Sequence, residues 1–202
     1  MGERFIKRVF DIALERNLDS LYVTVFEKHG ALIELFERYG FDRVGIKKSS
    51  SGMEIVLERR LDKIKNDVVL DYPRIPIGAR RHFVISIYPQ WHSRLLPDSL
   101  LKTENPNILE DVSHCNSIHK IYLTAMTGVK DLVRGDTLLI YRTQENGSAY
   151  FTSVITSLCV VEESVHISSF KSCDEFIKFC NPYSIFSEDE LIKFYIQKNI
   201  RG

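Results

Sequence analysis

Three features are missing from this 202-residue sequence, and each absence argues against a class of protein. Its four cysteines include no C-x-x-C pair, so we expect neither a zinc knuckle nor a disulfide framework. No apolar run approaches the roughly 20 residues that a membrane span needs, and the charged opening MGERFIKR is unlike a secretory signal. We therefore expect buried free thiols, no membrane partner and a cytoplasmic location.

An excess of charge of either sign is also missing. The 27 basic residues balance the 27 acidic ones. A protein that grips nucleic acid mainly by neutralising phosphates is strongly basic, so any nucleic-acid site here must be local. What the sequence does contain is 44% hydrophobic residues, enough to build well-packed cores.

Hydrophobic periodicity predicts the order helix, strand, helix, strand, strand in the first sixty residues. The run LYVTVF is nearly continuous in apolar residues, as expected of a strand covered on both faces. A serine- and glycine-containing turn at 49–52 joins the last two strands. The predicted ranges are 3–16, 21–26, 30–39, 41–47 and 53–58.

A change of composition then predicts a domain boundary. The stretch RRLDKIKND is charged, and DYPRIPIGARR contains two prolines and a glycine, which suit a connector. We therefore divide the chain into a first module at 1–60, a linker at 61–81 and a second domain at 82–202.

The second domain is predicted to be rich in strands. Its helices should come last, each opened by a capping box: Ser172 with Glu175, and Ser187 with Glu190. The turn-forming VKDLVRGD should precede the third strand. The predicted strands are 82–88, 120–126, 136–142 and the long, bent 149–163.

The segments GERFIKRVFDIALERN, LYVTVF and HGALIELFERYGF resemble the C-terminal half of the GNAT acetyltransferases. In that family a glycine-rich loop at a helix start presents backbone amides to the pyrophosphate of acetyl-CoA. Only the end of such a loop is present here, Gly2 and Glu3. The earlier family strands have no counterpart, so the resemblance implies an α/β half-sheet.

A second GNAT element, N-x-x-A-x-x-L-Y-x-x-x-G-F, is altered. Alignment puts His29 at the asparagine and Phe36 at the tyrosine that often acts as general acid. A phenyl ring has no proton to donate, and Tyr39 lies on another face of the helix. The remnant cofactor positions are thus Gly2, Glu3 and His29, and we expect no cofactor and no catalytic residue.

A half-sheet leaves an edge and a face to be covered. We expect it to be covered by a homodimer or another protein, by docking on the second domain, or by more chain. The alternative function is that of a GNAT-type N-acetyltransferase, completed by a missing segment or another chain and using acetyl-CoA.

Residues 82–202 resemble PUA-like domains of the ASCH or EVE kind. The resemblance rests on HFVISIYPQWHSRLLPD, VRGDTLLIYR, the long strand that follows and FSEDEL. It implies a β pseudo-barrel with flanking helices, holding a ligand in a cleft beside its first strand. The ASCH signature G-x-K-x-x-E-x-R does not follow that strand. The whole chain is therefore expected to be α+β.

The stretch YPQWHSR, which we expect to form a loop, concentrates groups that stack on bases and bind phosphate. Strand alternation allows only one of Tyr141 and Arg142 to face the same cleft. An alternative is that Trp91 caps the core and Arg94 pairs with Asp98. The candidate nucleic-acid-binding residues are Tyr88, Trp91, His92, Arg94, Tyr141 and Arg142.

Two further groups have structural interpretations. Arg80, Arg81 and His82 form a basic cluster that suits a solvated linker. His114, Cys115 and His119 include two adjacent ligands that cannot easily hold one ion, so no metal is expected; His166 stands alone. The leading hypothesis is a non-catalytic protein that recognises RNA, unpaired bases or a nucleotide through the PUA-like cleft.

Overall fold

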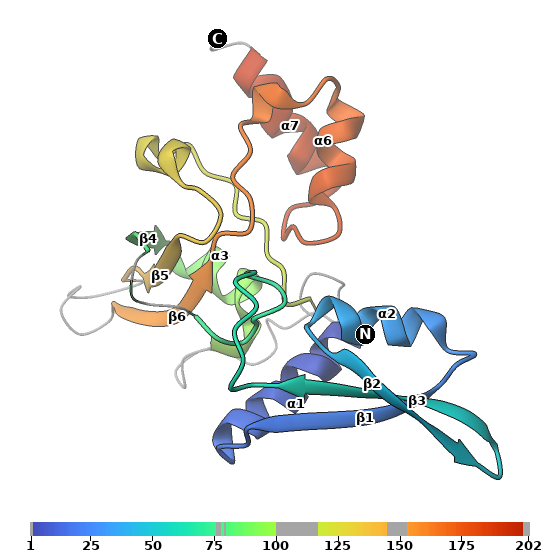
Figure 1. Ribbon diagram of the computed structural model, residues 1–202. Helices are drawn as coiled ribbons and strands as arrows, with labels where there is room; N and C mark the ends of the chain where they lie inside the picture. The colour runs from blue at the N-terminus through green and yellow to red at the C-terminus, as the bar shows by residue number, and fades with distance from the viewer. Residues whose placement is uncertain (1, 76–77, 79, 100–116, 145–152, 200–202) are drawn as a thin grey trace. The chain divides into compact units, whose positions relative to one another are not determined.

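The chain forms two compact units, 1–78 and 79–202, each with its own small sheet (Figure 1). The computed structural model describes residues 2–75, 78, 80–99, 117–144 and 153–199. Both units mix helices with strands, which confirms the α+β class. Within the described ranges neither sheet closes into a barrel.

Unit 1 has the predicted order of elements. Its sheet has the strand order β1-β3-β2, and both pairings are antiparallel. Helices α1 and α2 cover one face of this sheet (Figure 1). The elements are α1 (Gly2–Glu15), β1 (Ser20–Phe26), α2 (Gly30–Arg38), β2 (Asp42–Ser49) and β3 (Gly52–Arg60).

Strand β1 is covered on only one face, so the prediction of a strand buried on both faces is wrong. Val25 is buried, whereas Tyr22 is 80% exposed. On the open face Tyr22 is paired with Glu58 of β3, and Phe26 is paired with Glu54. Those carboxylates favour water, so this face of the sheet faces solvent even though β1 itself is apolar.

The first part of the expected linker packs onto unit 1. Leu61 and Asp71 are buried. The ring of Tyr72 lies 5.6 Å from that of Phe10 in α1 and 6.1 Å from that of Tyr39. Residues 61–75 therefore belong to unit 1, and Leu61, Asp71 and Tyr72 pack onto its core.

Unit 2 has a sheet of strand order β4-β5-β6. Strands β4 and β5 are parallel, and β5 and β6 are antiparallel. Short 3₁₀ turns lie at Pro97–Ser99, Thr127–Asp131 and Ile167–Ser169. The longer elements are β4 (His82–Ile87), α3 (Pro89–Leu95), β5 (Thr137–Arg142), β6 (Val154–Val160), α6 (Cys173–Cys180) and α7 (Glu188–Asn199).

The predicted strand at 120–126 does not form. The amide of Ile121 donates to the carbonyl of Tyr183 at 3.2 Å, and Ile121 and Leu123 pack against the cluster of α6 and α7. Their apolar side chains thus fill a helical core instead of a sheet. Of the predicted strand 149–163, residues 154–160 are strand, and 149–152 lie outside the described residues.

The predicted capping box of Ser187 and Glu190 is confirmed. At the other helix the Ser172 cap is confirmed, but Glu175 accepts from the amide of Lys171 instead of that of Ser172. The amide of Glu175 donates to Ser172 Oγ at 3.2 Å, and the amide of Glu190 donates to Ser187 Oγ at 3.4 Å. In return, Glu190 Oε2 accepts from the amide of Ser187 at 2.8 Å. These bonds satisfy amides that have no partner inside the helix, so both helices begin where the sequence predicts.

Candidate functional site

The stretch YPQWHSR, expected to be a loop, forms most of a short helix. Tyr88 caps α3 in an extended conformation, and Pro89 takes the first turn. Proline suits this position because its fixed φ fits the helix and its missing N–H has no helical partner. The helix sends Trp91 and Arg94, three residues apart, to one side and His92 to another.

Trp91 and Arg94 lie together on the segment that precedes α7. The Trp91 ring lies 5.2 Å from the ring of Phe186, and the Arg94 guanidinium carbon lies 5.7 Å from the centre of the Trp91 ring. Arg94 also donates to the carbonyl of Ile185. Trp91 is half-buried against the core formed by Ile85, Ile87, Leu95, Ile140 and Ile185. The pair therefore holds α3 to the chain before α7.

His92 is fully buried and cannot meet a ligand at the surface. Its Nε2 lies 2.7 Å from Thr156 Oγ1. Thr156 sits where the pairing of β5 and β6 shifts register, between the pairs Ile140–Ser157 and Tyr141–Ile155. The bulge turns the threonine hydroxyl towards α3, so His92 ties the helix to the sheet.

Tyr88 is the most exposed of the six candidates, at 68%. It follows the last residue of β4, directly at the start of α3. Strand β4 is parallel to β5, and the amide of Thr143, just past β5, donates to the carbonyl of Ile87 at 2.9 Å. Tyr88 therefore stands at the edge where both parallel strands end, a common place for ligands in α/β sheets.

Tyr141 and Arg142 lie on opposite faces of the sheet, as alternation requires. Arg142 pairs with Ile87 and is only 3% exposed, on the face that packs against Trp91. Tyr141 pairs with Ser86 on the other face. The Tyr122 hydroxyl reaches the carbonyl of Ser86 at 3.5 Å, and burial raises the pKa of Tyr122. The candidates are thus divided between two faces.

Arg80 and Arg81, expected to lie in a solvated linker, instead contact the turn before β5. Arg81 donates through Nε to Asp136 Oδ1 at 3.1 Å and through Nη2 to the carbonyl of Asp131 at 2.7 Å. Hydrogen bonding to Arg81 lowers the pKa of the Asp136 carboxyl. Gly135 has φ +93°, and a Cβ there would collide with the Arg80 guanidinium. Arg80 and Arg81 therefore pack around the turn before β5.

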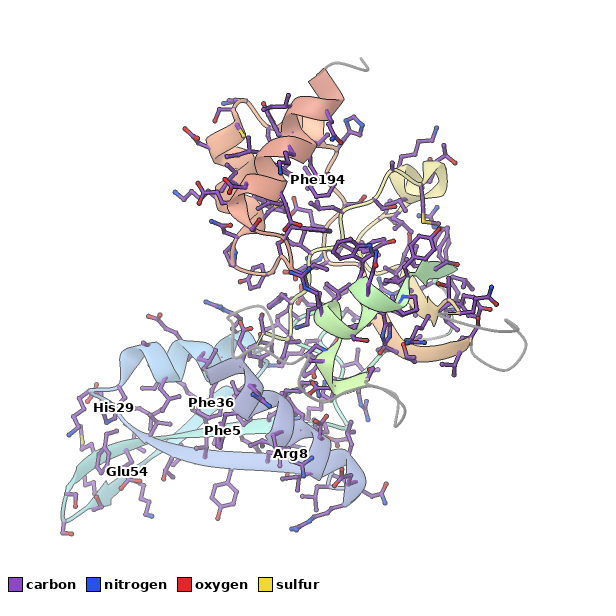
Figure 2. All side chains as sticks on the ribbon, turned by 180° about the vertical axis from the view of Figure 1, so that it is seen from behind. Phe5, Arg8, His29, Phe36, Glu54 and Phe194 are labelled. Atoms are coloured by element: carbon purple, nitrogen blue, oxygen red, sulfur yellow. The ribbon has the colours of Figure 1, made fainter. Side chains whose placement is uncertain are left out.

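The three remnant cofactor positions of unit 1 are not brought together. Arg38, at the end of α2, lies 4.0 Å from Glu3 at the start of α1, whereas His29 precedes the other end of α2. A helix of nine residues is roughly 13 Å long. Figure 2 shows His29 near Glu54, with Phe5 and Arg8 of α1 farther along the unit.

The start of α1 is also closely packed. A Cβ at Gly2 would lie 2.4 Å from a side-chain carbon of Leu35, so this glycine allows α1 to approach α2. Phe36 is buried with its ring 5.0 Å from that of Phe41, and Tyr39 is fully buried. Phe36, at the expected acid position, and Tyr39, three residues later, are therefore both too buried to reach a substrate.

Other features lie away from these candidates. A shallow hollow of about 490 Å³ is lined by Leu132–Arg134 and Glu162–Ser164. His119 Nδ1 lies 2.7 Å from Glu162 Oε2, and His166 Nδ1 lies 2.6 Å from Ser168 Oγ. His114 and Cys115 are outside the described residues. Among the described side chains no group of three histidines, cysteines or carboxylates could hold a metal ion.

None of the described helices combines the length and the apolar character needed to cross a bilayer. No protein-family model, curated protein or solved structure matches the chain.

Sequence reasoning missed the partners that hold the candidate residues in place. Phe186, Thr156 and Tyr122 come from segments 30 or more positions distant from the groups they contact: the Trp91 ring, the His92 ring and the Ser86 carbonyl. Nothing in the local sequence predicts that Thr156 bonds His92, because threonines are common in strands. Phe186 stands two residues before Glu188, at the start of a predicted helix, where an apolar residue commonly packs on the core.

Proposed function

We propose that unit 2 is a non-catalytic recognition module that binds an unpaired base of RNA or another nucleic acid, with Tyr88 as its stacking surface. The observation that carries the proposal is the exposed Tyr88 ring at the shared end of two parallel strands. Proteins that bind single strands use such aromatic planes, because every base has a face on which to stack.

Arg94 is the candidate cation that we expect to contribute to phosphate binding. Its guanidinium is held by the Trp91 ring and the Ile185 carbonyl, so binding would cost little further ordering of this side chain. Glu190 lies close enough for Arg94 to contribute to the lowered pKa of that carboxyl, behind the larger effect of the Ser187 amide. The neighbouring carboxylate reduces the attraction for phosphate.

This arrangement sets the kind of binding we expect. One exposed ring and one partly neutralised cation give a modest affinity that depends weakly on salt, because few counterions are released. Trp91 is half-buried against the core, and His92 and Arg142 are too buried to touch a base. Unpaired bases should be preferred over duplex, in which base faces are already stacked.

The test is a titration of fluorescently labelled single-stranded RNA with the full chain, followed by anisotropy. Tyr88→Ala should weaken binding by at least about fivefold, since stacking contributes about 1–3 kcal/mol per base. Tyr88→Phe, which keeps the ring, should bind like wild type. Phe179→Ala removes an exposed ring from α6 and serves as the matched control.

Two outcomes would overturn the proposal. One is the absence of RNA binding by the wild-type chain. The other is equal binding by wild type and Tyr88→Ala. The acetyltransferase alternative has less support, because Gly2 packs on Leu35, away from His29 at the start of α2, and Phe36 is enclosed in the core.

A further inference from the structure

The two edges of the unit 1 sheet differ in how they are protected. Strand β2 carries four charged residues in DRVGIKKS and has a register shift between Arg43 and Gly45. Charges and bulges are the usual devices that stop an edge strand from pairing with another chain. Strand β1, SLYVTVF, contains no charged residue, no proline and no glycine. It lacks each of these devices.

The free side of β1 is a regular edge. All seven residues of β1 pair with β3 without a register shift, and among the described residues no strand occupies its other side. Alternate residues of such a strand point an N–H and a C=O outwards, ready to form a second ladder. Tyr22, in the middle of the strand, is 80% exposed.

We propose that β1 pairs in antiparallel fashion with β1 of a second copy of this chain, so that the two unit 1 sheets become one continuous sheet. A self-pairing strand produces a two-fold dimer with the same residues on both sides. The partner is inferred to be another copy because β1 is complementary to itself in one register.

That register places Thr24 opposite Thr24 of the second copy, on the two-fold axis. Tyr22 then faces Phe26 of the other chain, and Val23 faces Val25. Tyr22, Thr24 and Phe26 share the open face of the sheet, where their partners on β3 are Glu58, Val56 and Glu54. Cross-strand aromatic pairs and threonine pairs stabilise antiparallel ladders.

The sequence of β1 itself favours this register. Residues 22–26 read YVTVF, so pairing about Thr24 sets Tyr22 against Phe26 and Val23 against Val25. A shift of the pairing by two residues, to an axis at Val23, sets Tyr22 against Thr24 and loses the aromatic pair that stabilises an antiparallel ladder.

The experiment uses charge exchange at the two-fold position in the full chain. Thr24→Lys alone and Thr24→Glu alone each place two like charges opposite each other, and each should shift the protein from dimer to monomer. An equimolar mixture of the two variants should restore the dimer, because Lys then faces Glu. Sedimentation velocity measures the mass against the chain mass of 23.4 kDa.

The matched control is Ile46→Lys on the other edge. Ile46 lies in β2 and is 62% exposed, so this variant adds a lysine to an edge strand that is already charged. It should remain a dimer. Melting curves of the variants establish that they are folded, and restoration in the mixture cannot arise from misfolded chains.

Three results would overturn the proposal: a wild-type protein that is monomeric at every accessible concentration, Thr24 variants that both remain dimeric, or a mixture that fails to associate. A second measurement tests the register itself. Thr24→Cys should form a disulfide between the introduced thiols of the two copies under mild oxidation, found by mass spectrometry of peptides. Tyr22→Cys, which faces Phe26, should form no such bond, and equal cross-linking of both would refute the register.

Discussion

The guanidinium of Arg94 lies over the ring of Trp91, 5.7 Å from its centre, while that ring packs on Phe186. Residues from α3 and from the chain before α7 are joined by this contact, although about ninety positions separate them in the sequence. The contact gives Trp91 a structural role in the core of unit 2.

Replacement of Trp91 by alanine should therefore destabilise the protein. The loss of a packed ring from the core of unit 2 should lower the free energy of unfolding by about 3 kcal/mol. Tyr88→Ala, which removes an exposed ring, should change it by less than about 0.5 kcal/mol. Urea unfolding followed by circular dichroism separates the two, and equal midpoints for Trp91→Ala and wild type would refute the assignment.

The pair of Arg81 and Asp136 should make unit 2 sensitive to acid. Hydrogen bonding to Arg81 lowers the pKa of Asp136 below its ordinary value of 3.8. The carboxylate thus contributes stability above pH 3.8, and this contribution is lost as the pH falls through the lower, folded-state pKa. Asp136→Asn should melt at a lower temperature at neutral pH and show a flatter decline in acid.

Glu163→Gln is the control for that experiment, because Glu163 is an exposed carboxylate of the same unit. Its melting temperature should follow the wild-type curve throughout. An Asp136→Asn variant with the wild-type acid profile would show that the pair of Arg81 and Asp136 contributes nothing to stability.

The buried Arg59 should be replaceable by an apolar residue without loss of stability. It is 0% exposed, its Nη1 donates to the carbonyl of Arg60 at 2.6 Å, and its Nε and Nη2 have no partner among the described residues. Burial lowers the pKa of Arg59. A buried charge with two unbonded nitrogens is costly to keep away from water, so Arg59→Met should melt no lower than wild type.

Asp71, in contrast, should not be replaceable. Its carboxylate is buried and accepts from the amides of Lys65 at 2.7 Å and Asp67 at 3.1 Å. Asp71→Ala leaves both donors without this partner and should cost about 2 kcal/mol in chemical unfolding. If Asp71→Ala proves as stable as wild type, the segment 61–75 is not held to unit 1 by this carboxylate.

The chain should not bind acetyl-CoA tightly. The diphosphate would meet only the first residues of α1, where Gly2 is packed against Leu35, and Phe36 cannot donate a proton. Isothermal titration calorimetry with acetyl-CoA should give no heat of binding in the micromolar range. Micromolar or tighter binding would revive the acetyltransferase alternative.

Local sequence signals determined much of this protein. The order of elements in unit 1, the two serine caps and the opposite faces of Tyr141 and Arg142 all follow from short-range patterns. Such patterns suffice because capping bonds span three residues and strand alternation has a period of two.

Only the tertiary structure decided what lies on the second face of each element. LYVTVF has the pattern of a doubly covered strand, yet its open face meets Glu54 and Glu58 of β3, which prefer water. Residues 120–126 have the pattern of a strand, yet they find their apolar partners on α6 and α7. YPQWHSR has the composition of one exposed aromatic loop, yet a helix turns His92 into the core and leaves Tyr88 outside. In each case the deciding partner is distant along the chain, and burial depends on that partner instead of on the local sequence.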